Sequence, residues 1–540
     1  MPPRPATVAA LALVCLSGLA AAHPPDDLAI AGVYPNPVAD GDAGEFVVLS
    51  ADAPTHLANW TLRDDEGGVA LPNRTVEGRV VLSTAPDRTR ERVDARVLAL
   101  PGGLELANGG EPLALGRRGR TVQRINYTDA PEGERGTVTS DGLAWAPLGR
   151  TDFPVVRGSG GTVRAFVLPD SPAVPIRTLR SADARILLAG YTLTSRRVAD
   201  ALVAARERGV AVRVLVDGGP VGGLTRRQAR VLDRLVAANV SVTALGGPRA
   251  SYRFHHAKYA VVDDRALVTT ENWKPAGTGG HSSRGWGVVV RSPAVVSALA
   301  ETFRADAAGP GSRPWPAFAA GETFTPAAAP PANATFPTRV PSRAVRAASV
   351  ELLRAPDNAE RRVVALLDNA TTSIRVQQVS IGSRTQPFLR AVLRAARRGV
   401  RVRVLLSGAW YVREDNAALV AWLNRVAARE GLPLSARVAD PGGRYEKIHA
   451  KGLVVDGEHV LVGSLNWNNN SVRENREVAL LLHGTSVADY YRDVFHADWR
   501  GGIWLVPVGL LGLVVLAAGV AVLVGRRIEF AGDTPPRVGP

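Results

Sequence analysis

The segment Phe254–Asp264 reads FHHAKYAVVDD, and the segment Lys447–Gly457 reads KIHAKGLVVDG. Both carry a histidine, a lysine two positions later and an aspartate five positions after the lysine. These residues are His256, Lys258 and Asp263 in the first copy and His449, Lys451 and Asp456 in the second. One imidazole can attack phosphorus while the other protonates the leaving oxygen, and two ammonium groups can neutralise the non-bridging oxygens. The repeated motif therefore predicts phosphodiester chemistry at a site that both copies form.

Lysine is rare in this chain, which adds weight to the two motif lysines. Lys and Arg total 65, but only four are Lys, namely Lys258, Lys274, Lys447 and Lys451. A compact ammonium and a planar guanidinium are not interchangeable where a tetrahedral phosphoryl group must fit. Lysine at the same place in both motifs therefore indicates a role at a phosphoryl group.

The paired motifs resemble the HxKxxxxD signatures of the phospholipase D superfamily, over roughly residues 161–500. The resemblance implies two pseudosymmetric α/β halves with one active site at their interface. It also implies a covalent phosphohistidine intermediate, no metal requirement and no cofactor. Each motif is followed by a polar turn, TTENW at 269–273 and GSLNW at 463–467. The resemblance assigns phosphate contacts to Lys258, Lys451, Asn272 and Asn466, with Thr270 and Ser464 at the hydroxyl position of the turns.

The resemblance also implies which residues support the histidines. Asp263 and Asp456 receive a structural, hydrogen-bonding role. Glu477, in the segment NREVALLL, matches an acid that bonds a catalytic imidazole across the interface of the halves. The corresponding place in the first half reads RGWGV, with Gly287, so the sequence predicts a carboxylate partner for only one histidine. On this basis His256 is the predicted nucleophile and His449 the predicted general acid.

The two halves repeat one order of strands and helices, which predicts an internal duplication with an α/β fold. The expected strands are Ile186–Leu193, Val210–Gly218, Ile374–Ile381 and Val400–Gly408, and the expected helices are Ser195–Arg208, Thr225–Asn239, Gln386–Arg398 and Glu414–Arg429. Strands that alternate with helices imply a largely parallel sheet with helices packed on it. The predicted halves cover 161–308 and 345–500, and a Pro/Ala-rich linker covers 309–344.

Residues 26–150 contain short β-rich runs separated by turn residues, which predicts an antiparallel β-sandwich. The runs are Phe46–Ser50, Trp60–Asp64, Arg79–Ser83, Leu104–Asn108 and Val122–Tyr127. The order of GEFVVL, NWTLRDDEG, LELANGGEPLALGRRG and INY resembles a lamin-tail domain, an immunoglobulin-like module. That resemblance implies a binding or spacing role.

The two ends of the chain carry targeting signals. Residues 1–22 have the pattern of a secretory signal peptide, and the only cysteine, Cys15, lies within it. Residues 503–524 are uncharged and apolar, close to the ~20 residues that span a bilayer, and Arg526 and Arg527 follow. The sequence therefore predicts a single-pass cell-membrane protein with an extracytoplasmic body and a cytoplasmic tail over 525–540. Glycosylation sequons agree with an exported body: Asn59, Asn73, Asn126, Asn239, Asn333, Asn369 and Asn469.

The formal net charge of +15 suggests an anionic partner. The leading hypothesis is a membrane-anchored phosphodiesterase that hydrolyses or transfers a phosphatidyl group, with a monomeric active site built by both halves. A nuclease acting on DNA or RNA, and a surface-binding protein whose enzyme fold has lost activity, are the alternatives. An aromatic-lined cleft would favour nucleic acid, and a deep apolar channel would favour acyl chains. His255, beside the motif, is expected to be a packing histidine.

Overall fold

The computed structural model describes residues 28–37, 43–90, 92–93, 95–102, 104–149, 151–247, 250–327, 329–501 and 539. The predicted signal peptide over 1–22 and membrane helix over 503–524 lie outside these residues, as does the predicted tail except at 539. Within the described ranges, no helix has the length and apolar character needed to cross a membrane. The chain divides into two compact units, 1–148 and 149–540.

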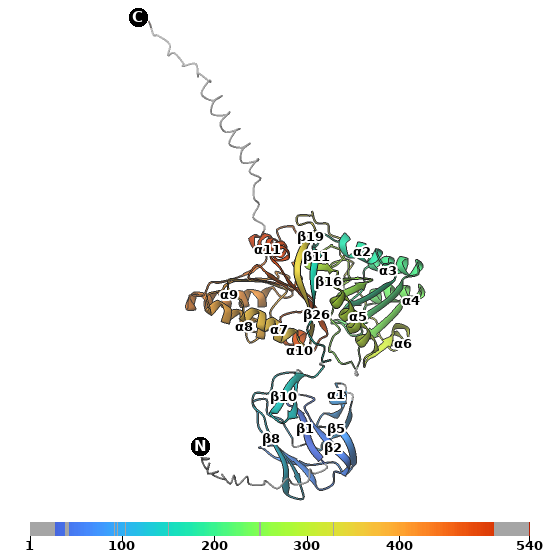
Figure 1. Ribbon diagram of the computed structural model, residues 1–540, viewed down its shortest axis with the longest axis vertical. Coiled ribbons are helices and arrows are strands. Elements are labelled where there is room, and N and C mark those ends of the chain that lie inside the picture. The colour runs from blue at the N-terminus through green and yellow to red at the C-terminus, as the bar shows by residue number, and fades with distance from the viewer. Residues whose placement is uncertain are drawn as a thin grey trace, which may run out of the picture. The chain divides into compact units, whose positions relative to one another are not determined.

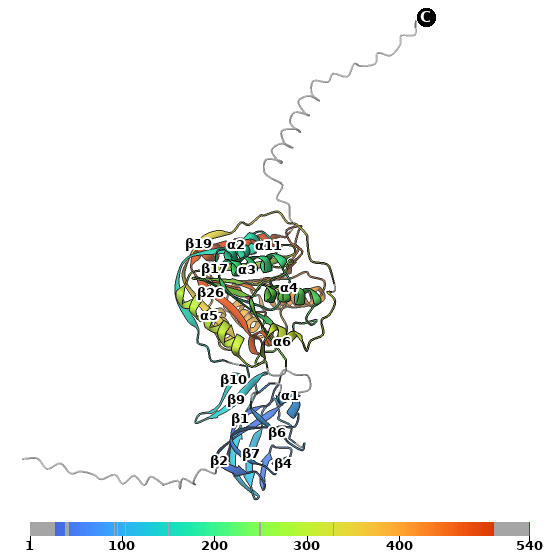
Figure 2. The same cartoon turned by 90° about the vertical axis from the view of Figure 1, so that its right-hand side faces the viewer.

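The first unit contains two β-sheets that share one apolar core, to which Val47, Leu49, Trp60 and Leu115 contribute (Figure 2). The larger sheet has the order β10 (Gly142–Pro147), β9 (Glu134–Thr139), β1 (Leu28–Tyr34), β2 (Phe46–His56), β5 (Thr75–Ser83) and β6 (Arg96–Ala99). The smaller has the order β4 (Gly68–Ala70), β3 (Trp60–Arg63), β7 (Pro112–Arg117) and β8 (Arg120–Asn126), and α1 covers Pro86–Arg90. The resemblance to a lamin-tail domain stays a prediction.

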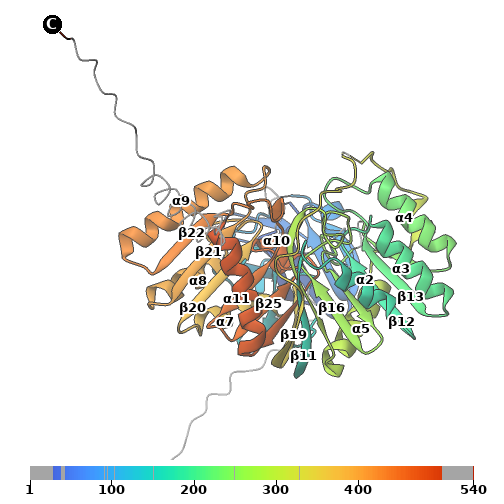
Figure 3. The same cartoon turned by 90° about the horizontal axis from the view of Figure 1, so that it is seen from above.

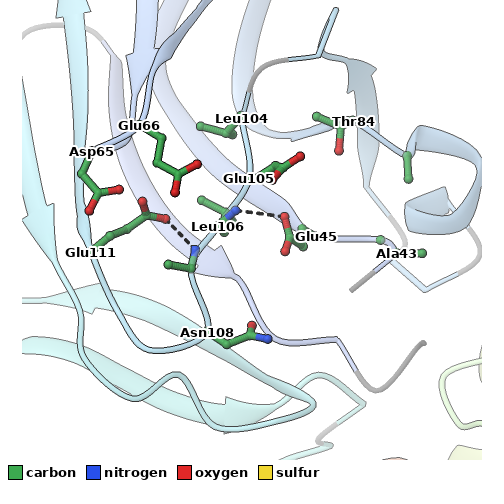
Figure 4. Close-up of a pocket in the computed structure, with 13 residues that line it drawn as sticks. Ala43, Glu45, Asp65, Glu66, Thr84, Leu104, Glu105, Leu106, Asn108 and Glu111 are labelled. Carbon is green, nitrogen blue, oxygen red and sulfur yellow. Dashed lines mark hydrogen bonds between the residues drawn. The ribbon is translucent and has the colours of Figure 1, made fainter. Parts of the chain in front are cut away.

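Two expectations for this unit are wrong. Leu104–Asn108 is not a strand. Carboxylates, and not a neighbouring strand, accept the hydrogen bonds of its backbone N–H groups. Leu106 N donates to Glu45 at 3.1 Å, and Ala107 N donates to Glu111 at 2.8 Å (Figure 4). The larger sheet is also not wholly antiparallel, since β5 and β6 run parallel.

The second unit is built on one long sheet, and its strand order is the same read outward in either direction from the central pair β11 and β19 (Figure 3). The first side consists of β11 (Val156–Leu168), β17 (Ser283–Val290), β16 (Arg265–Thr269), β15 (Tyr259–Val262), β12 (Arg185–Gly190), β13 (Ala211–Asp217), β14 (Ser241–Leu245) and β18 (Ser312–Pro314). The second side consists of β19 (Arg343–Ala355), β26 (Glu477–His483), β25 (His459–Gly463), β24 (Gly452–Val455), β20 (Ser373–Gln378), β21 (Arg401–Leu406) and β22 (Leu434–Val438). A further short strand, β23 (Lys447–Ile448), pairs with β17. The expected duplication of an α/β half is confirmed.

Helices flank this sheet in two matching groups (Figure 1). The first half contains α2 (Ala173–Arg180), α3 (Arg196–Glu207), α4 (Arg226–Ala237), α5 (Pro293–Ala308) and α6 (Trp315–Ala319). The second half contains α7 (Ala359–Asp368), α8 (Pro387–Arg397), α9 (Arg413–Glu430), α10 (Asn469–Arg473) and α11 (Thr485–Arg500). Two of the predicted helices begin where a side chain caps the first turn: Ser195 accepts from Val198 N, and Thr225 accepts from Gln228 N.

The sheet is mixed, which corrects the prediction of a largely parallel sheet. Helical crossovers make β12, β13 and β14 parallel, and likewise β20, β21 and β22. The motif strands are instead joined to their successors by tight turns at Asp263 and Asp456, whose φ angles are 50° and 54°. Such a short turn can only connect antiparallel neighbours, as β15–β16 and β24–β25 are.

The predicted linker contains regular structure that belongs to the first half. Strand β18 extends the sheet beside β14, and Trp315 and Phe318 of α6 are buried in the first half's core. The following chain stays on this half, since Thr325 N donates to Leu224 O at 2.9 Å. Much of the segment between the halves is therefore packed against the body.

Two buried arginines join the halves. Arg284, in β17, binds one aspartate of its own half and one of the other, and Arg476, next to β26, does the same with the halves exchanged. The ion pairs are Arg284–Asp170 at 2.5 Å, Arg284–Asp498 at 3.0 Å, Arg476–Asp357 at 2.9 Å and Arg476–Asp306 at 3.1 Å. Both guanidinium groups are almost fully excluded from solvent. The duplication therefore repeats an ionic clamp as well as the strand order.

Replacing Arg476 by Gln should lower the free energy of unfolding of the second unit by about 3–5 kcal/mol, because two buried carboxylates lose their cation. Denaturant unfolding followed by circular dichroism measures the change. Arg390→Gln, an exposed position on α8, is the matched control and should be close to neutral. Equal unfolding midpoints for the two variants would show that the clamp does not stabilise the fold.

Candidate active site

The two motif segments cross from one half to the other. His256 N donates to Arg476 O at 3.0 Å, and His449 N donates to Arg284 O at 2.9 Å. Strand β23 ends directly before His449 and pairs in parallel with β17, with Lys447 opposite Ser283. Each motif histidine is therefore fixed to the backbone of the opposite half, and both lie at the interface.

A carboxylate from the opposite half holds the His256 ring. Its Nδ1 lies 2.9 and 3.0 Å from the two oxygens of Glu477. Glu477 is itself anchored, since Ser471 Oγ donates to its Oε1 at 2.8 Å and Asn475 Nδ2 donates at 3.3 Å. The structure thus brings together the pair that the sequence placed across the interface, and Nε2 is the ring nitrogen that the carboxylate does not engage.

The second histidine also has a carboxylate, which corrects the expectation that only one does. His449 Nδ1 lies 3.2 Å from Glu271 Oε2. Glu271 is buried in the turn after β16, between Thr270 and Asn272. The argument that made His256 the nucleophile because it alone had a carboxylate therefore fails.

Glu271 does not occupy the position in the first half that corresponds to Glu477 in the second. Thr270 N donates to Trp286 O and Ser464 N donates to Val478 O, both at 2.9 Å, so Gly285 rather than Gly287 is the counterpart of Glu477. A Cβ on Gly285 would lie 2.2 Å from Glu271 Cγ. The Glu271 side chain therefore occupies the space that a side chain at 285 would fill.

A signal for this exchange is present in the two turns. TTENW has Glu271 where GSLNW has Leu465, and the strand that follows has Gly285 where the second half has Glu477. Each half therefore keeps one acid, at a different position. Comparison of the turns together with the following strands could have found Glu271, whereas comparison of the strands alone could not.

The motif lysines lie beside the histidines, and both are almost fully buried. Lys258 Nζ donates to His256 O, and Lys451 Nζ donates to His449 O at 2.8 Å. Lys451 Nζ is also 3.2 Å from the Nε2 atom of His449. The ring of Tyr191 packs edge-on against His256 with centroids 4.7 Å apart, and Lys258 Nζ is 5.3 Å from the centre of the same ring.

Burial sets the protonation state of the site. It lowers the pKa of His256 to about 4, with Glu477 opposing the shift and Lys258 adding to it. Burial likewise lowers the pKa of His449 to about 4, with Lys451 adding to the shift and Glu271 opposing it. Both imidazoles are therefore neutral at pH 7, the state in which a ring nitrogen can act as a nucleophile.

The side chains of the two polar turns that were predicted to contact phosphate differ in their exposure. Asn272 and Asn466 are partly exposed, and Asn272 Oδ1 has no hydrogen-bond partner among the described residues. The hydroxyls of Thr270 and Ser464 are fully buried and accept from Trp286 N at 3.0 Å and Val478 N at 3.1 Å. These two side chains therefore support the turns, and their phosphate contact stays a prediction.

The motif aspartates lie at the far end of each motif strand, where they bind backbone amides. Asp263 accepts from Asp183 N, Ala184 N and Arg185 N at 2.8–2.9 Å. Asp456 accepts from the corresponding amides of the second half, Thr371 N, Thr372 N and Ser373 N, at 2.8–2.9 Å. These bonds lower the pKa of both carboxyls against the opposing effect of burial.

His255 is fully buried, and its Nε2 lies 3.2 Å from Asp306 Oδ2. It thus packs against the ionic clamp rather than facing the catalytic centre, in line with the expectation of a packing histidine. Over the described ranges, no group of three His, Cys, Asp or Glu side chains is arranged to hold a metal ion.

Comparison with known proteins gives relatives that match part of this chain. Mitochondrial cardiolipin hydrolase of Xenopus tropicalis is 32% identical over 145 residues, which is 27% of this chain and 62% of that protein. Cardiolipin synthase A of Salmonella arizonae is 33% identical over 98 residues, which is 18% of this chain and 19% of that protein. The chain thus spans less than two thirds of the length of these relatives.

Among solved structures, phosphatidylserine synthase of Haemophilus influenzae aligns with a TM-score of 0.49 and 13% identity, covering 63% of this chain and 87% of that chain. The family model described as "Cardiolipin synthase, PLD-like domain" matches residues 176–307 and 363–499. These stretches contain both motifs, their turns and Glu477, and the chain belongs to the phospholipase D superfamily.

Proposed function

We propose that this protein is a phosphodiesterase of the phospholipase D type that hydrolyses or transfers a phosphatidyl group. One observation carries the proposal: two neutral imidazoles, each backed by a carboxylate and each beside a lysine, come from opposite halves into one site. The names of the relatives, cardiolipin hydrolase and cardiolipin synthase, agree with a phospholipid substrate.

His256 is the proposed nucleophile, because Glu477 engages Nδ1 with both oxygens and is held by further bonds. A bond forms between Nε2 and phosphorus, and the bond from phosphorus to the leaving oxygen breaks. His449 protonates that oxygen, and the negative charge of the bound phosphate favours the protonated form of His449. His449 then removes a proton from water or an alcohol, the oxygen of that molecule bonds to phosphorus, and the bond from phosphorus to Nε2 of His256 breaks.

Exposed apolar side chains beside the site favour lipid over nucleic acid. Val221 is 80% exposed in the loop after β13, and Trp410 is 87% exposed in the equivalent loop after β21. Val221 N donates to the hydroxyl of Tyr191, whose ring packs on the first motif histidine. Trp410 packs against Tyr411, whose ring centre is 5.2 Å from Nζ of Lys447, two positions before the second motif histidine. Apolar tips on both sides of a phosphate site are suited to a lipid surface.

The membrane anchor and the extracytoplasmic location are also proposals. They are supported by the secretory pattern of residues 1–22, the apolar run at 503–524 and the two arginines that follow it. An anchor after α11 would keep the site close to its lipid. The sandwich of the first unit, whose sequence resembles a lamin-tail domain, is proposed to have a binding role or to act as a spacer.

Activity is tested with the full chain reconstituted into vesicles of phosphatidylglycerol or cardiolipin, and separately in detergent with single- and double-stranded DNA, all in EDTA. We expect release or exchange of the lipid headgroup, because the imidazoles supply both the nucleophile and the acid. The double variant His256→Asn/His449→Asn is the blank. Cleavage of DNA with intact lipids would replace the proposal by the nuclease, and no turnover of either would favour a binding protein.

Glu477 should assist the attack on phosphorus, and Glu271 should assist protonation of the leaving oxygen. Glu477→Gln should lower kcat/KM by roughly 10²–10⁴-fold with any leaving group, because it weakens the nucleophile. Glu271→Gln should lower it comparably for a lipid alcohol but far less for a nitrophenyl ester, which needs no acid. Glu322→Gln, an exposed position after α6, is the control. The opposite dependence on leaving group would exchange the roles of the histidines.

Burial lowers the pKa of Lys451 to about 8, against the opposing charges of Glu271 and Glu477. The ammonium is present below that pH and is lost above it, so kcat/KM should fall as pH rises through about 8. Lys451→Arg should be less active but should lack this alkaline decline, because a guanidinium stays charged. A decline at the same pH in this variant would assign it to another group.

A further inference from the structure

The last described helix, α11, lies against a group of arginines on the second half. Arg375 of β20 donates from Nε to Nε2 of His496 in α11 at 3.1 Å. Arg403 of β21 and Arg437 of β22 both stack on the ring of Trp499 in α11, with guanidinium carbons 5.5 and 4.7 Å from the ring centre. These side chains therefore share the sheet face on which α11 lies. The arginine patch, as we call it, consists of Arg375, Arg401, Arg403, Arg437, Trp499 and Arg500.

The charges of the arginine patch lie close together and have no carboxylate partner. Arg401 lies two positions before Arg403 on β21, so both side chains point to the same face. Burial lowers the pKa of Arg375, and the nearby charges of Arg403, Arg492 and Arg401 lower it further. Within the described ranges of the second unit, none of the five arginines forms an ion pair with a carboxylate. The ion pairs on this part of α11 are Arg492–Asp489 at 2.6 Å and Arg492–Asp493 at 3.7 Å. Like charges at short range repel, so an anionic partner would stabilise the patch.

The first half is an internal comparison, because the duplication gives each patch residue a counterpart there. Strand β20 pairs with β21 as β12 pairs with β13, and the clamp aspartates align α11 with α5. By this alignment the counterparts of Arg375, Arg401, Arg403, Arg437, Trp499 and Arg500 are Leu187, Ala211, Arg213, Thr243, Ala307 and Ala308. A single arginine is thus kept in the first half, which has the same strand order and the same clamp. The fold of a half therefore does not require the arginine patch.

Protection of an open sheet edge explains only part of the arginine patch. Among the described strands, β22 is the outermost on its side, whereas β18 covers the equivalent strand β14. A charged side chain such as Arg437 keeps an open edge from pairing with other chains. Arg375 and Arg403 instead lie on the inner strands β20 and β21, which have neighbours on both sides. Their positions indicate a partner that meets the whole face.

We propose that the arginine patch binds the surface of a bilayer that contains anionic lipids, as a contact separate from the catalytic centre. Helix α11 ends at Arg500, and the apolar run of the sequence begins at 503. Three residues span at most about 11 Å, so the patch lies beside the proposed anchor. Basic side chains next to a membrane segment attract anionic headgroups, and tryptophan is favoured at the level of the headgroups. The inference rests on the proposed anchor but not on the proposed catalytic step.

The surroundings of Trp499 favour a bilayer over a nucleic acid. Its ring stacks on Phe495, with centroids 5.7 Å apart, and is also covered by the guanidinium groups of Arg403 and Arg437. Binding of nucleic acid without sequence preference uses aromatic rings whose faces are open to bases. A guanidinium that stacks on a ring keeps its N–H groups free for phosphate oxygens. The patch therefore offers contacts to phosphates and not to bases.

The test uses the full chain with His256→Asn/His449→Asn, so that lipids stay intact, and with Cys15→Ser, so that one introduced cysteine carries a fluorescent label. The label is placed by Ser435→Cys, at an exposed position of β22 opposite the patch strand β21. Ser241→Cys, the exposed counterpart on β14, is the matched control. The chain is reconstituted into nanodiscs of phosphatidylcholine with or without phosphatidylserine. Quenching by the neutral solute acrylamide then measures how far each label is shielded from water.

The label at 435 should be shielded in nanodiscs with phosphatidylserine and not in phosphatidylcholine alone, and the label at 241 in neither. Arg401→Gln/Arg437→Gln/Arg500→Gln should lower the ratio of shielded to unshielded label by roughly 100-fold, or about 5-fold for each charge. High salt should reduce the shielding in the parent chain as well. The matched charge control removes three exposed arginines of α2 and α4 and should keep the shielding: Arg177→Gln/Arg180→Gln/Arg230→Gln.

Equal shielding of the label at 435 with and without phosphatidylserine, or none in either, would overturn the proposal. Single- or double-stranded DNA that shields this label more than phosphatidylserine does, in nanodiscs of phosphatidylcholine, would replace the bilayer by nucleic acid. Co-elution of the chain with nanodiscs of phosphatidylcholine alone tests the anchor separately. Because both histidines are replaced, the result is also independent of whether the vesicle assay shows turnover.

Discussion

The crossed clamp of Arg284 and Arg476 is the constraint on which the active site depends. Each guanidinium is buried between one carboxylate from its own half and one from the other. The backbone carbonyl of the same residue accepts a bond from the motif histidine of the opposite half. Separation of a buried cation from its carboxylates leaves unpaired charges. Separation of the two halves therefore has a high cost in free energy. One residue type thereby fixes the interface and the position of the reacting ring.

Much of the fold followed from the sequence because the signals were local. The strand at 211–217 and the caps at Ser195 and Thr225 stand close to where periodicity and capping residues put them. The direction of the motif strands was missed, because it depends on tight turns at Asp263 and Asp456 that alternation of strands and helices does not reveal. The segment Leu104–Asn108 has the composition of a strand, but the carboxylates of Glu45 and Glu111 accept hydrogen bonds from its backbone N–H groups.

The site was less predictable than the motifs suggest. The pairing of Glu477 with His256 was expected from the resemblance, and the structure places them together. Glu271 was missed because its role depends on an empty space at Gly285, and only the register of two distant strands relates those positions. The bonds of the Thr270 and Ser464 hydroxyls to backbone N–H groups were also not foreseen, since a turn sequence does not show which way its polar atoms face.

Glu477 and Glu271 hold different positions in the two halves, which affects the orientation in which a phosphodiester can bind. A site with perfect two-fold symmetry accepts a phosphodiester equally well in either of two orientations, and each histidine then alternates between two tasks. Here one acid stands on a strand and the other in a turn. The duplicated chain has thus lost its exchange symmetry at the point of reaction. Under the proposed function, an asymmetric site of this kind favours one orientation of the phosphodiester, and with it one departing side.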